Sequence, residues 1–588
     1  METENWTVTS DEFESWDGTR LFFRTWEPKV RSDRALIVIH RGHEHSGRVE
    51  RQIEDLGLSD SWAFSWDARG HGESPGERGD AESYYHLVKD LDSFVRFVSG
   101  NHGIPVENMV ILANSVGAVT ASAWVHDYAP RIRAMVLAAP AFRIRLYVPL
   151  AIPFLRLLLR IKPRAKISSY VKSRMLTHDP EQAALYDKDS LITRDISVRV
   201  LLGLHDTATR ILADAAAIET PTLVLSAGSD WVVKNGAQQA FFEKLSSPVK
   251  KMKSYPGFFH AILHEKERQL PVDAARQFIL EAFRCPVDRS NLSRGDDSGY
   301  TQREYDLLRC SPPLWKGLFF GLQRMALRTV GRLSSGISIG CETGFDSGTS
   351  LDYVYENEPR GKTFLGKWID RAYLNAVGWR GIRERGENLQ ACLAEEIRSR
   401  GGKEESVRVL DVATGCGRYV LEVIRTNPDL RIEARLRDNT PRNVETGTRN
   451  AATMGVESVE FVLGDAFDKE SLLAESPPPD IVIVSGLYEL FPENAQVVQS
   501  LEGIAGVLKP GGSLIYTSQP WHPQIEMIAR TCNNREGEPW IMRRRTQAEM
   551  DELVASVGLA KTRMLPDFYG IFSVSVALKP EGNGGEAV

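Results

Sequence analysis

The sequence predicts an α/β protein with two successive domains, each built on a mostly parallel sheet. Three observations support this fold class. Apolar stretches alternate with amphipathic helical patterns near the N-terminus. An apolar run at 109–113 ends in a small-x-Ser-x-Gly turn, and helix-compatible residues follow. A second apolar run, at 407–411, leads into a glycine-bearing turn that opens another helix. Because single cores stop growing near ~250–300 residues, a chain of 588 residues requires more than one core.

The N-terminal elements follow in an order that suits such a sheet. Residues 6–27 alternate polar and apolar side chains around Asp17 and Gly18, which predicts a hairpin. Residues 35–39 and 62–66 predict buried strands, and the helical spacing of apolar residues at 83–99 predicts a helix. The strand predicted from the apolar run at 109–113 comes next, and Ser115 stands in the turn that follows it.

A serine hydroxyl is a poor nucleophile near neutral pH, so it needs a base and a group that orients the base. Asp230 follows the predicted strand at 222–225, and His260 follows a short strand and the turn at 256–257. The order Ser, Asp, His, with each residue just past a strand, predicts that Ser115 is the nucleophile, His260 the base and Asp230 the orienting acid. His264 is the rival base.

Two further motifs carry a family resemblance. The stretches HRGHEHSGR at 40–48 and DARGHGES at 67–74, with GERG at 76–79, resemble the monoacylglycerol lipase and lysophospholipase group of α/β-hydrolases. The resemblance covers about residues 10–285, and we assign 1–285 to this domain. It implies an oxyanion hole made by the backbone N–H groups of Gly42 and Val116.

The chain departs from this family's pattern at three positions. Ala113 replaces a usual glycine, which implies a less ideal turn with retained geometry. Asn114 replaces a usual histidine, and its effect on the substrate side stays open. Arg41 replaces a usual glycine beside the oxyanion loop, which implies a narrower or charged site.

A helical cap is expected at about 140–215, where the family inserts one. Residues 128–178 contain no Asp or Glu, and the apolar segment at 146–161 carries Arg156 and Arg160 on one helical face. This pattern is typical of an interface with anionic lipid, and equally of a cap helix that covers an acyl pocket. Residues 307–341 form a second acid-free basic amphipathic segment.

Residues 286–405 are expected to form a linker and a helical region. The polar stretch at 285–299 predicts the linker. Residues 361–400 predict charged helices, in which Arg371, Arg380, Arg383 and Arg385 either belong to a cap over the next domain or lie on solvated faces.

The second domain is assigned to 406–588, and its glycine-bearing turn contains Asp411, Ala413, Gly415 and Gly417. Glycines there let a ligand approach the backbone at the carboxyl end of the strand. A dinucleotide-binding fold is the competing interpretation. The pattern D-x-A-x-G-x-G resembles motif I of class I S-adenosylmethionine-dependent methyltransferases, a Rossmann-like family.

This second resemblance covers about 406–580 and implies S-adenosyl-L-methionine as cofactor. It implies that Asp438 contacts the ribose, that Asp465 and Ala466 lie at the adenine, and that Ser485 follows a buried strand beside the cofactor. Tyr488, Glu489, Trp521 and His522 are candidates for lining the acceptor site or for structural roles. No metal-ligand cluster stands out.

Composition narrows the class of protein. The chain is 42% hydrophobic and 26% charged, with a net charge of -6 and a pI of about 6.1, so a general nucleic-acid-binding footprint is absent. Six scattered cysteines predict no disulfide framework and favour the cytoplasm. The N-terminus lacks an apolar signal region, and no run of ~18 apolar residues is present. A protein that is soluble, or peripheral to the inner face of the membrane, is expected.

These observations lead to a bifunctional enzyme as the main hypothesis: a serine hydrolase of lipid esters, of monoacylglycerol or lysophospholipid type, fused to a methyltransferase that acts on the same or a related lipid. A second hypothesis gives the hydrolase a small soluble ester or thioester. A third makes the methyltransferase fold a cofactor-sensing, non-catalytic module. The sequence predicts neither the methyl acceptor nor the oligomeric state.

Overall fold

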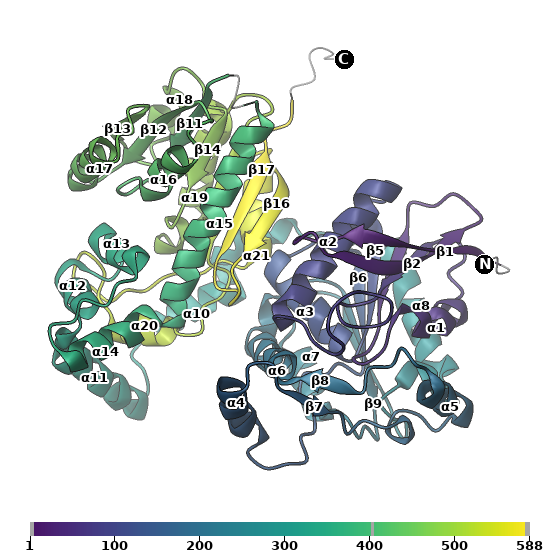
Figure 1. Cartoon of the computed structure of the whole chain (residues 1–588). Helices are drawn as coiled ribbons and strands as arrows, with labels where there is room; N and C mark the ends of the chain where they lie inside the picture. The colour runs from purple at the N-terminus through teal and green to yellow at the C-terminus, as the bar shows by residue number, and fades with distance from the viewer. Residues whose placement is uncertain (1–4, 402–404, 582–588) are drawn as a thin grey trace. The chain divides into compact units, whose positions relative to one another are not determined.

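The computed structural model describes residues 5–401 and 405–581 and divides into two compact units, Met1–Asp288 and Arg289–Val588 (Figure 1). Each unit is described by itself. Parts of three predicted segments lie outside the described residues: the start of the N-terminal stretch, residues 402–404 before the second domain, and the end of the chain after 581. No helix among the described residues has the length and apolarity that a membrane-spanning segment needs.

The first unit is built on an eight-stranded sheet. Its strands β1 and β2 form the predicted hairpin and pair antiparallel, β2 pairs antiparallel with β4, and the remaining neighbours are parallel. In spatial order the strands are β1 (Trp6–Glu14), β2 (Arg20–Pro28), β4 (Trp62–Trp66), β3 (Ala35–Ile39), β5 (Met109–Asn114), β6 (Ala134–Ala138), β9 (Thr222–Ala227) and β10 (Lys250–Tyr255). The inner parallel strands β3, β5, β6 and β9 are buried on both faces, which explains their continuous apolar runs, whereas the edge strand β10 is largely exposed.

Helices cover both faces of this sheet. Helices α1 (Glu50–Leu56) and α8 (Gln269–Arg284) share a core cluster with one face. Helices α2 (Tyr84–His102) and α3 (Val116–Tyr128) pack together on the opposite side (Figure 1). The remaining elements are α7 (Asn235–Lys244), η1 (Ser46–Arg48), η2 (Val106–Asn108), η4 (Ala215–Ala217) and η5 (Ile262–His264).

A cap is inserted between β6 and β9. It consists of α4 (Ala151–Ile161), β7 (Lys166–Ser168), η3 (Ser173–Met175), α5 (Pro180–Lys188), β8 (Asp195–Ser197) and α6 (Val198–Ala213). Helix α4 packs on α6 through Leu155, while Phe154, Leu157 and Ile161 are 64%, 54% and 75% exposed. The predicted amphipathic helix therefore exists, and a row of large apolar side chains on it faces outward.

The second unit contains a seven-stranded sheet. In spatial order its strands are β13 (Val459–Leu463), β12 (Ile432–Asp438), β11 (Val407–Asp411), β14 (Ile481–Val484), β15 (Ser513–Ser518), β17 (Ser573–Leu578) and β16 (Ala560–Pro566). All neighbours are parallel except β17, which runs antiparallel to β15 and β16. The chain order reverses between β11 and β14, and open sheets of this kind bind ligands at that switch point.

Helices cover both faces of this sheet as well. One core cluster joins the sheet to α15 (Val377–Ser399) and α16 (Arg418–Thr426). The cluster on the other face includes α18 (Lys469–Leu473), α19 (Asn494–Val507) and α21 (Gln547–Ser556). Helix α17 (Pro441–Met454) packs on β12 and β13, and η8 (Tyr488–Leu490) follows β14.

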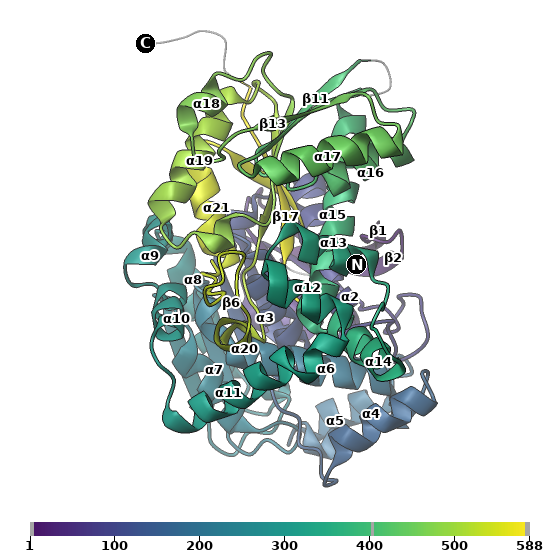
Figure 2. The ribbon, with the colours of Figure 1, turned by 90° about the vertical axis from the view of Figure 1, so that its left-hand side faces the viewer.

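The region expected as a linker and helices belongs largely to the second unit. It contains η6 (Ser290–Arg294), α9 (Gly295–Ser298), α10 (Tyr300–Arg309), α11 (Leu314–Arg328), η7 (Val330–Leu333), α12 (Ser335–Thr343), α13 (Gly348–Glu356) and α14 (Phe364–Leu374). Helices α11 to α14 gather with α20 (Ile525–Thr531) beyond one edge of the sheet (Figures 1 and 2).

The polar stretch at 285–299 is not an extended linker over most of its length. Residues 290–298 form η6 and α9, and Asp296 Oδ2 accepts a hydrogen bond from the backbone N–H of Asn494. The Asn494 side chain donates to the carbonyl of Ser293. Polar groups of this stretch therefore hydrogen-bond to the start of α19. The composition of the stretch alone did not predict these contacts.

Candidate active site and cofactor pocket

Ser115 stands on a strained turn between β5 and α3. Its φ is +52°, a backbone conformation that is unfavourable for a residue with a side chain and that persists only where the surrounding structure enforces it. Gly117 makes the turn possible, because a Cβ atom there would lie 2.6 Å from Ile39 Cγ2 and 2.7 Å from the His40 carbonyl oxygen. The close packing of the turn against β3 therefore holds Ser115 at the head of the helix.

Ser115, His260 and Asp230 form a continuous hydrogen-bonded row. The Ser115 Oγ atom lies 2.8 Å from His260 Nε2, and His260 Nδ1 lies 2.8 Å from Asp230 Oδ2. With the ring proton on Nδ1, the histidine donates to the carboxylate and accepts from the serine. All three side chains are buried. The geometry is that of a base poised on a hydroxyl.

Asp230 is held as a carboxylate by its surroundings. Its Oδ1 atom accepts hydrogen bonds of 2.7 and 2.9 Å from the backbone N–H groups of Val232 and Val233. Burial raises the pKa of Asp230, but the His260 ring and the backbone donors outweigh burial and lower this pKa below its usual range. The residue can therefore stabilise a positive charge on His260.

The two residues expected at the oxyanion hole lie against each other beside Ser115. A Cβ atom on Gly42 would lie 2.9 Å from Val116 Cγ2, and both residues line the same pocket as Ser115. Val116 opens α3, so its backbone N–H has no partner within the helix. A developing negative charge beside Ser115 would meet this helix N-terminus.

The pocket at Ser115 has a volume of about 160 Å³ and mainly apolar walls. The cap supplies many of them, including Leu146, Ile167 and Leu176, and α6 adds Val200, Leu201 and Leu204. Helix α4 contributes none of the lining residues. Its exposed apolar row therefore has no part in covering this pocket.

The three departures from the family pattern have distinct structural places. Ala113 is buried within β5. Asn114 does not line the pocket, and its Nδ2 atom donates to the Ile39 carbonyl and to Gln52 Oε1. Arg41 does line the pocket, but Glu44 pairs with it through two hydrogen bonds of 3.0 and 2.5 Å. The charge of Arg41 is thus compensated within its own loop.

His264, the rival base, lies in a different environment. Its Nε2 atom donates to the Arg48 carbonyl, and its Nδ1 atom is near Gln52. Burial, reinforced by Arg41, lowers the pKa of His264 to about 3. Neither nitrogen is paired with Ser115, so the structure brings only His260 to the serine.

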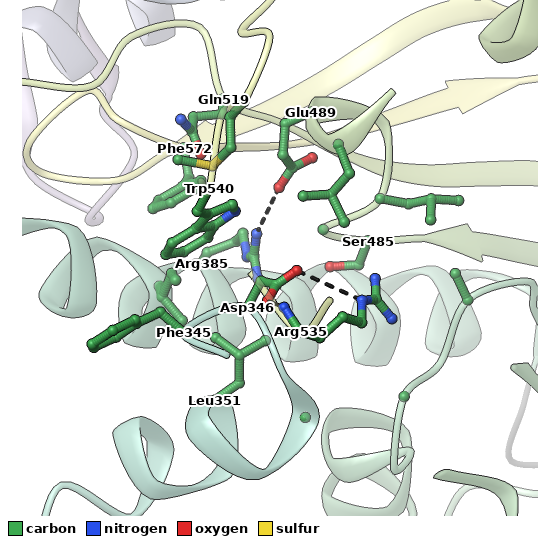
Figure 3. A pocket seen from close by; sticks show the side chains of 18 of the residues that line it. Phe345, Asp346, Leu351, Arg385, Ser485, Glu489, Gln519, Arg535, Trp540 and Phe572 are labelled. Carbon is green, nitrogen blue, oxygen red and sulfur yellow. Dashed lines mark hydrogen bonds and ion pairs between the residues drawn. The ribbon is translucent and has the colours of Figure 1, made fainter. Parts of the chain in front are cut away.

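A larger pocket, of about 320 Å³, opens at the carboxyl ends of the strands in the second unit (Figure 3). Six of the eight residues predicted to bind the cofactor line it: Ala413, Gly415, Asp438, Asp465, Ala466 and Ser485. Asp411 and Gly417 do not. The first bonds to its own turn, and the second packs closely on Phe461 and Leu436.

The lining residues fit the adenosyl part of S-adenosylmethionine. Gly415 has a φ of +59° and nothing within 4 Å of where a Cβ atom would stand, so the backbone there is open to a ligand. Asp438 accepts hydrogen bonds from Gly415, Thr440 and Asn443, which leaves one of about four lone-pair positions on its carboxylate for a ribose hydroxyl.

The Asp411 carboxyl group holds the glycine turn in place through hydrogen bonds. It accepts hydrogen bonds from the Ala413 backbone N–H and the Tyr419 hydroxyl. Complete burial raises its pKa to about 7. The role of turn support explains why an acid stands at the end of this strand without reaching the pocket.

Beyond Gly415, Asp438 and their neighbours, the pocket is lined by aromatic side chains from the helical region and from loops after β15. Trp379 and Trp540 stack at 6.3 Å, Tyr373 lies edge-on to Trp379, and Phe572 adds another face. Of the four predicted acceptor-side candidates, Glu489 and His522 line the pocket, whereas Tyr488 and Trp521 do not. Tyr488 instead bonds to Ser500.

Sequence reasoning missed the pocket residues that come from outside the second-domain motifs. Arg385 is buried and lines the pocket, while Arg371 and Arg380 are exposed. Gln519 and Trp540 lie on loops without a motif. The one available signal was the position of Arg385 close to Tyr373 and Trp379, which does not distinguish a buried face from a solvated one. Among residues 5–401 and 405–581, no three metal-ligating side chains are grouped.

Comparisons with known proteins cover both units. The family model described as "Serine aminopeptidase, S33" matches residues 31–267, and the model described as "Putative methyltransferase" matches residues 275–579. The Escherichia coli (strain K12) protein YnbC, described as uncharacterized, is 44% identical over 573 residues, which is 96% of this chain and 98% of YnbC.

The N-terminal half has its own relatives. The monoacylglycerol lipase of Mycolicibacterium smegmatis is 24% identical over 279 residues, covering 47% of this chain and 98% of the lipase. The crystal structure of the Paleococcus ferrophilus monoacylglycerol lipase aligns with 47% of this chain and 99% of that chain, with a TM-score of 0.40 and 22% identity. The matches confirm the two resemblances predicted from the sequence.

Proposed function

The chain belongs to the family described as "Putative methyltransferase", whose model it matches over more than half of its length. We propose that it is a bifunctional enzyme, a serine hydrolase of lipid esters fused to an S-adenosylmethionine-dependent methyltransferase. The hydrogen-bonded row of Ser115, His260 and Asp230 is the observation that carries the first activity. The glycine-lined pocket at the switch point of the second sheet supports the other.

In the hydrolase reaction, Ser115 Oγ attacks the ester carbonyl while His260 Nε2 takes the hydroxyl proton. Asp230 stabilises the resulting imidazolium, and the backbone N–H groups of Gly42 and Val116 donate to the carbonyl oxygen as it becomes negative. His260 then protonates the leaving alcohol. Water, deprotonated by the same histidine, then attacks the acyl carbonyl. The bond from this carbon to Ser115 Oγ breaks, His260 returns the proton to Oγ, and the acid leaves.

A lipid ester is the proposed substrate class. The apolar walls that the cap supplies match an acyl group, and two relatives of this half are described as a monoacylglycerol lipase and a phospholipase. Glu44 compensates Arg41, so the pocket offers no free positive charge at that loop to a small anionic substrate. A small soluble ester or thioester is the alternative.

In the second unit, the open backbone at Gly415, the Asp438 carboxylate and the segment containing Asp465 and Ala466 would hold the adenosyl part of the cofactor, with Ser485 beside it. The bound cofactor supplies an electrophilic methyl group. The protein's own contribution is to orient the acceptor and exclude water, for which the aromatic walls are suited. We propose an apolar, lipid-like acceptor because these walls dominate that end of the pocket.

Peripheral attachment to an anionic membrane completes the proposal. On α4 the exposed apolar row stands beside Arg160, Lys162 and Arg164. On α11 the large apolar side chains Leu314, Trp315, Leu318, Phe319, Leu322 and Met325 are all more than half exposed, and Arg328 follows. Apolar side chains on a helix, with basic side chains on its last turn or directly after it, suit the interface of an anionic bilayer. All six cysteines are free, which favours the cytoplasmic side.

A lipid comparison tests the proposal as a whole. Purified protein is incubated with a monoacylglycerol, a lysophospholipid and a short soluble ester, and then with a lipid extract and methyl-labelled cofactor. Faster turnover of the micellar esters and label in a lipid product are expected. Turnover of the soluble ester alone favours the alternative substrate class. Cofactor binding without transfer to any lipid favours a cofactor-sensing module.

A further inference from the structure

Arg385 and Glu489 lie where the amino-acid end of a bound cofactor is expected. This expectation follows from the direction in which the cofactor must extend across the strands. The residues proposed at the adenine follow β13, and the residue proposed at the ribose ends β12. The sheet continues in the order β11, β14. A cofactor with its adenosine at β13 and β12 therefore extends its amino-acid end across the glycine turn after β11 towards the end of β14.

Arg385 lies at that end of the pocket. It is on α15, one turn before Leu389 and two turns before Leu393, which pack against the sheet. Its guanidinium is close to the loop after β14, since a Cβ atom on Gly486 would lie 3.3 Å from one of its nitrogens, and it lies 4.9 Å from the centre of the Phe572 ring. Only 7% of Arg385 is exposed, yet it lines the pocket.

This buried cation is incompletely paired. The nearest carboxylate oxygen, on Glu489, is 3.6 Å from its nitrogen, which is longer than a hydrogen bond. The guanidinium also reaches the Tyr355 hydroxyl. A guanidinium has five N–H donors, so donors remain for a ligand. Burying a positive charge whose N–H donors lack partners destabilises the folded state unless an anion binds to those donors.

Arg385 and Glu489 thus present one positive and one negative group side by side, both directed at the pocket (Figure 3). An α-amino acid carries a carboxylate and an ammonium group on the same carbon. The spacing and signs match: the carboxylate would accept from Arg385, and the ammonium would donate to Glu489. Neither residue belongs to the glycine turn or to the other motifs that suggested the cofactor.

We propose that Arg385 and Glu489 form a clamp for the α-amino-acid end of S-adenosylmethionine. The inference rests on the proposed methyltransferase function and goes further by assigning recognition of this zwitterion to a helix that precedes the sheet. A consequence is that the helical region before residue 400 is part of the cofactor site, and that ligands lacking the amino acid are discriminated against. A methyl acceptor that carries a carboxylate would present the same chemistry to Arg385, and the experiment below separates the two sources.

Calorimetric titration with two nucleosides tests the clamp without any turnover. S-adenosylhomocysteine contains the amino acid, and 5′-methylthioadenosine lacks it. A hydrogen bond to a charged group contributes about 1.5–3 kcal/mol, which corresponds to about 10- to 150-fold in affinity. We expect Arg385→Met to weaken S-adenosylhomocysteine by at least about 10-fold and to leave 5′-methylthioadenosine unchanged. Glu489→Gln should act in the same direction, and Arg385→Lys should restore part of the loss.

Arg380→Met is the matched control, because Arg380 lies on the same helix but is exposed and does not line the pocket. It should change neither titration. Unchanged 5′-methylthioadenosine binding in each variant shows that the pocket is folded. If Arg385→Met leaves S-adenosylhomocysteine binding intact, the clamp is wrong, and the carboxylate partner of Arg385 must be sought in the acceptor. If the unmodified protein binds neither nucleoside, the proposed cofactor itself is wrong.

Discussion

The Nε2 atom of His260 lies 2.8 Å from the Oγ atom of Ser115, although 145 residues separate them. His264, only four residues further along, bonds instead to the backbone of Arg48. Burial, reinforced by Arg41, lowers the pKa of His264 to about 3, so this ring stays neutral near neutral pH but has no serine to activate. The difference between these two histidines is therefore one of position, and it is testable.

Replacement of each histidine by asparagine should separate their roles. His260→Asn removes the base and should lower ester turnover by several orders of magnitude, because Ser115 is then a weak nucleophile. Labelling by a fluorophosphonate probe should fall in parallel. His264→Asn should retain most of both activities while lowering the melting temperature, since a buried hydrogen bond is lost. Ser115→Ala should abolish labelling altogether. Comparable activity losses in both histidine variants would contradict the assignment of His260.

A side chain at Gly415 should block the cofactor pocket. Gly415→Arg fills the open space in front of the backbone, so S-adenosylhomocysteine should no longer raise the melting temperature. For the unmodified protein, a ligand at one hundred times its dissociation constant adds about 2.7 kcal/mol to the free energy of unfolding. The measurement is a thermal unfolding scan with and without the nucleoside.

Gly455→Arg is the control for that experiment. Gly455 also has a positive φ, +68°, and open space at its Cβ position, but it ends α17 and does not line the pocket. The backbone strain of the two substitutions is thus similar, and only the obstruction differs. Loss of the ligand-induced shift in both variants would mean that strain, and not blockage, is responsible.

The sequence predicted those residues of the two sites that directly follow a strand of the sheet. Ser115, Asp230 and His260 each follow a parallel strand, and carboxyl ends of parallel strands meet at one edge, so their convergence follows from order alone. The pairing of Asn114 with Gln52 was not predictable, because it depends on how α1 packs against β5. Similarly, the glycine pattern identified the turn at 411–417 but not which of its glycines lines the pocket. Gly417 turned out to be needed for packing on Phe461.

Arg385 was beyond sequence reasoning for a different reason. Helical periodicity places it on α15, but its burial is produced by Phe572 and Glu489, which come much later in the chain. The same holds for the stretch at 290–298, whose polar residues find partners on α19. Contacts that join distant segments of the chain leave no local pattern, so these features required the structure.

The pH dependence of stability in the second unit should change when Asp411 is replaced. Burial raises the pKa of Asp411 from 3.8 to about 7. The folded state therefore binds a proton more readily than the unfolded state, and the stability that this proton provides is lost as pH rises from about 4 to about 7. One proton changes the free energy of unfolding by up to about 1.4 kcal/mol per pH unit.

Asp411→Asn should remove this dependence. Its melting temperature relative to the unmodified protein should rise steadily between pH 5 and pH 7 and level off above, as measured by calorimetry of the full chain. Asp567, whose pKa burial also raises to about 7, remains in both proteins and cancels in the difference. A difference that stays constant across this range would show that Asp411 is ionised throughout.

Membrane attachment through α4 should depend on both charge and apolar exposure. Each Lys or Arg near an anionic surface contributes about 1 kcal/mol, and this attraction weakens as salt screens it. Arg156 is partly compensated by its ion pair with Asp206, so the useful positions are Arg160, Lys162 and Arg164. Reversing these three to Glu should reduce co-sedimentation with phosphatidylglycerol vesicles, while turnover of a short soluble ester remains, because α4 does not line the pocket.

Two further sets of variants test whether the loss of vesicle binding is specific to the surface of α4. Reversal of three other exposed cations, Lys253, Lys266 and Arg284, changes the net charge equally and should leave sedimentation nearly intact. Replacing Phe154 and Leu157 by Ser keeps every charge but removes apolar area that would enter the acyl boundary, so binding should weaken even at low salt. Equal binding to neutral and anionic vesicles, or equal losses in both charge-reversal variants, would contradict an α4 docking site. Helix α11 carries its own exposed apolar row. Any binding to anionic vesicles that remains in the α4 variants should therefore disappear when Leu318, Phe319 and Leu322 are also replaced by Ser.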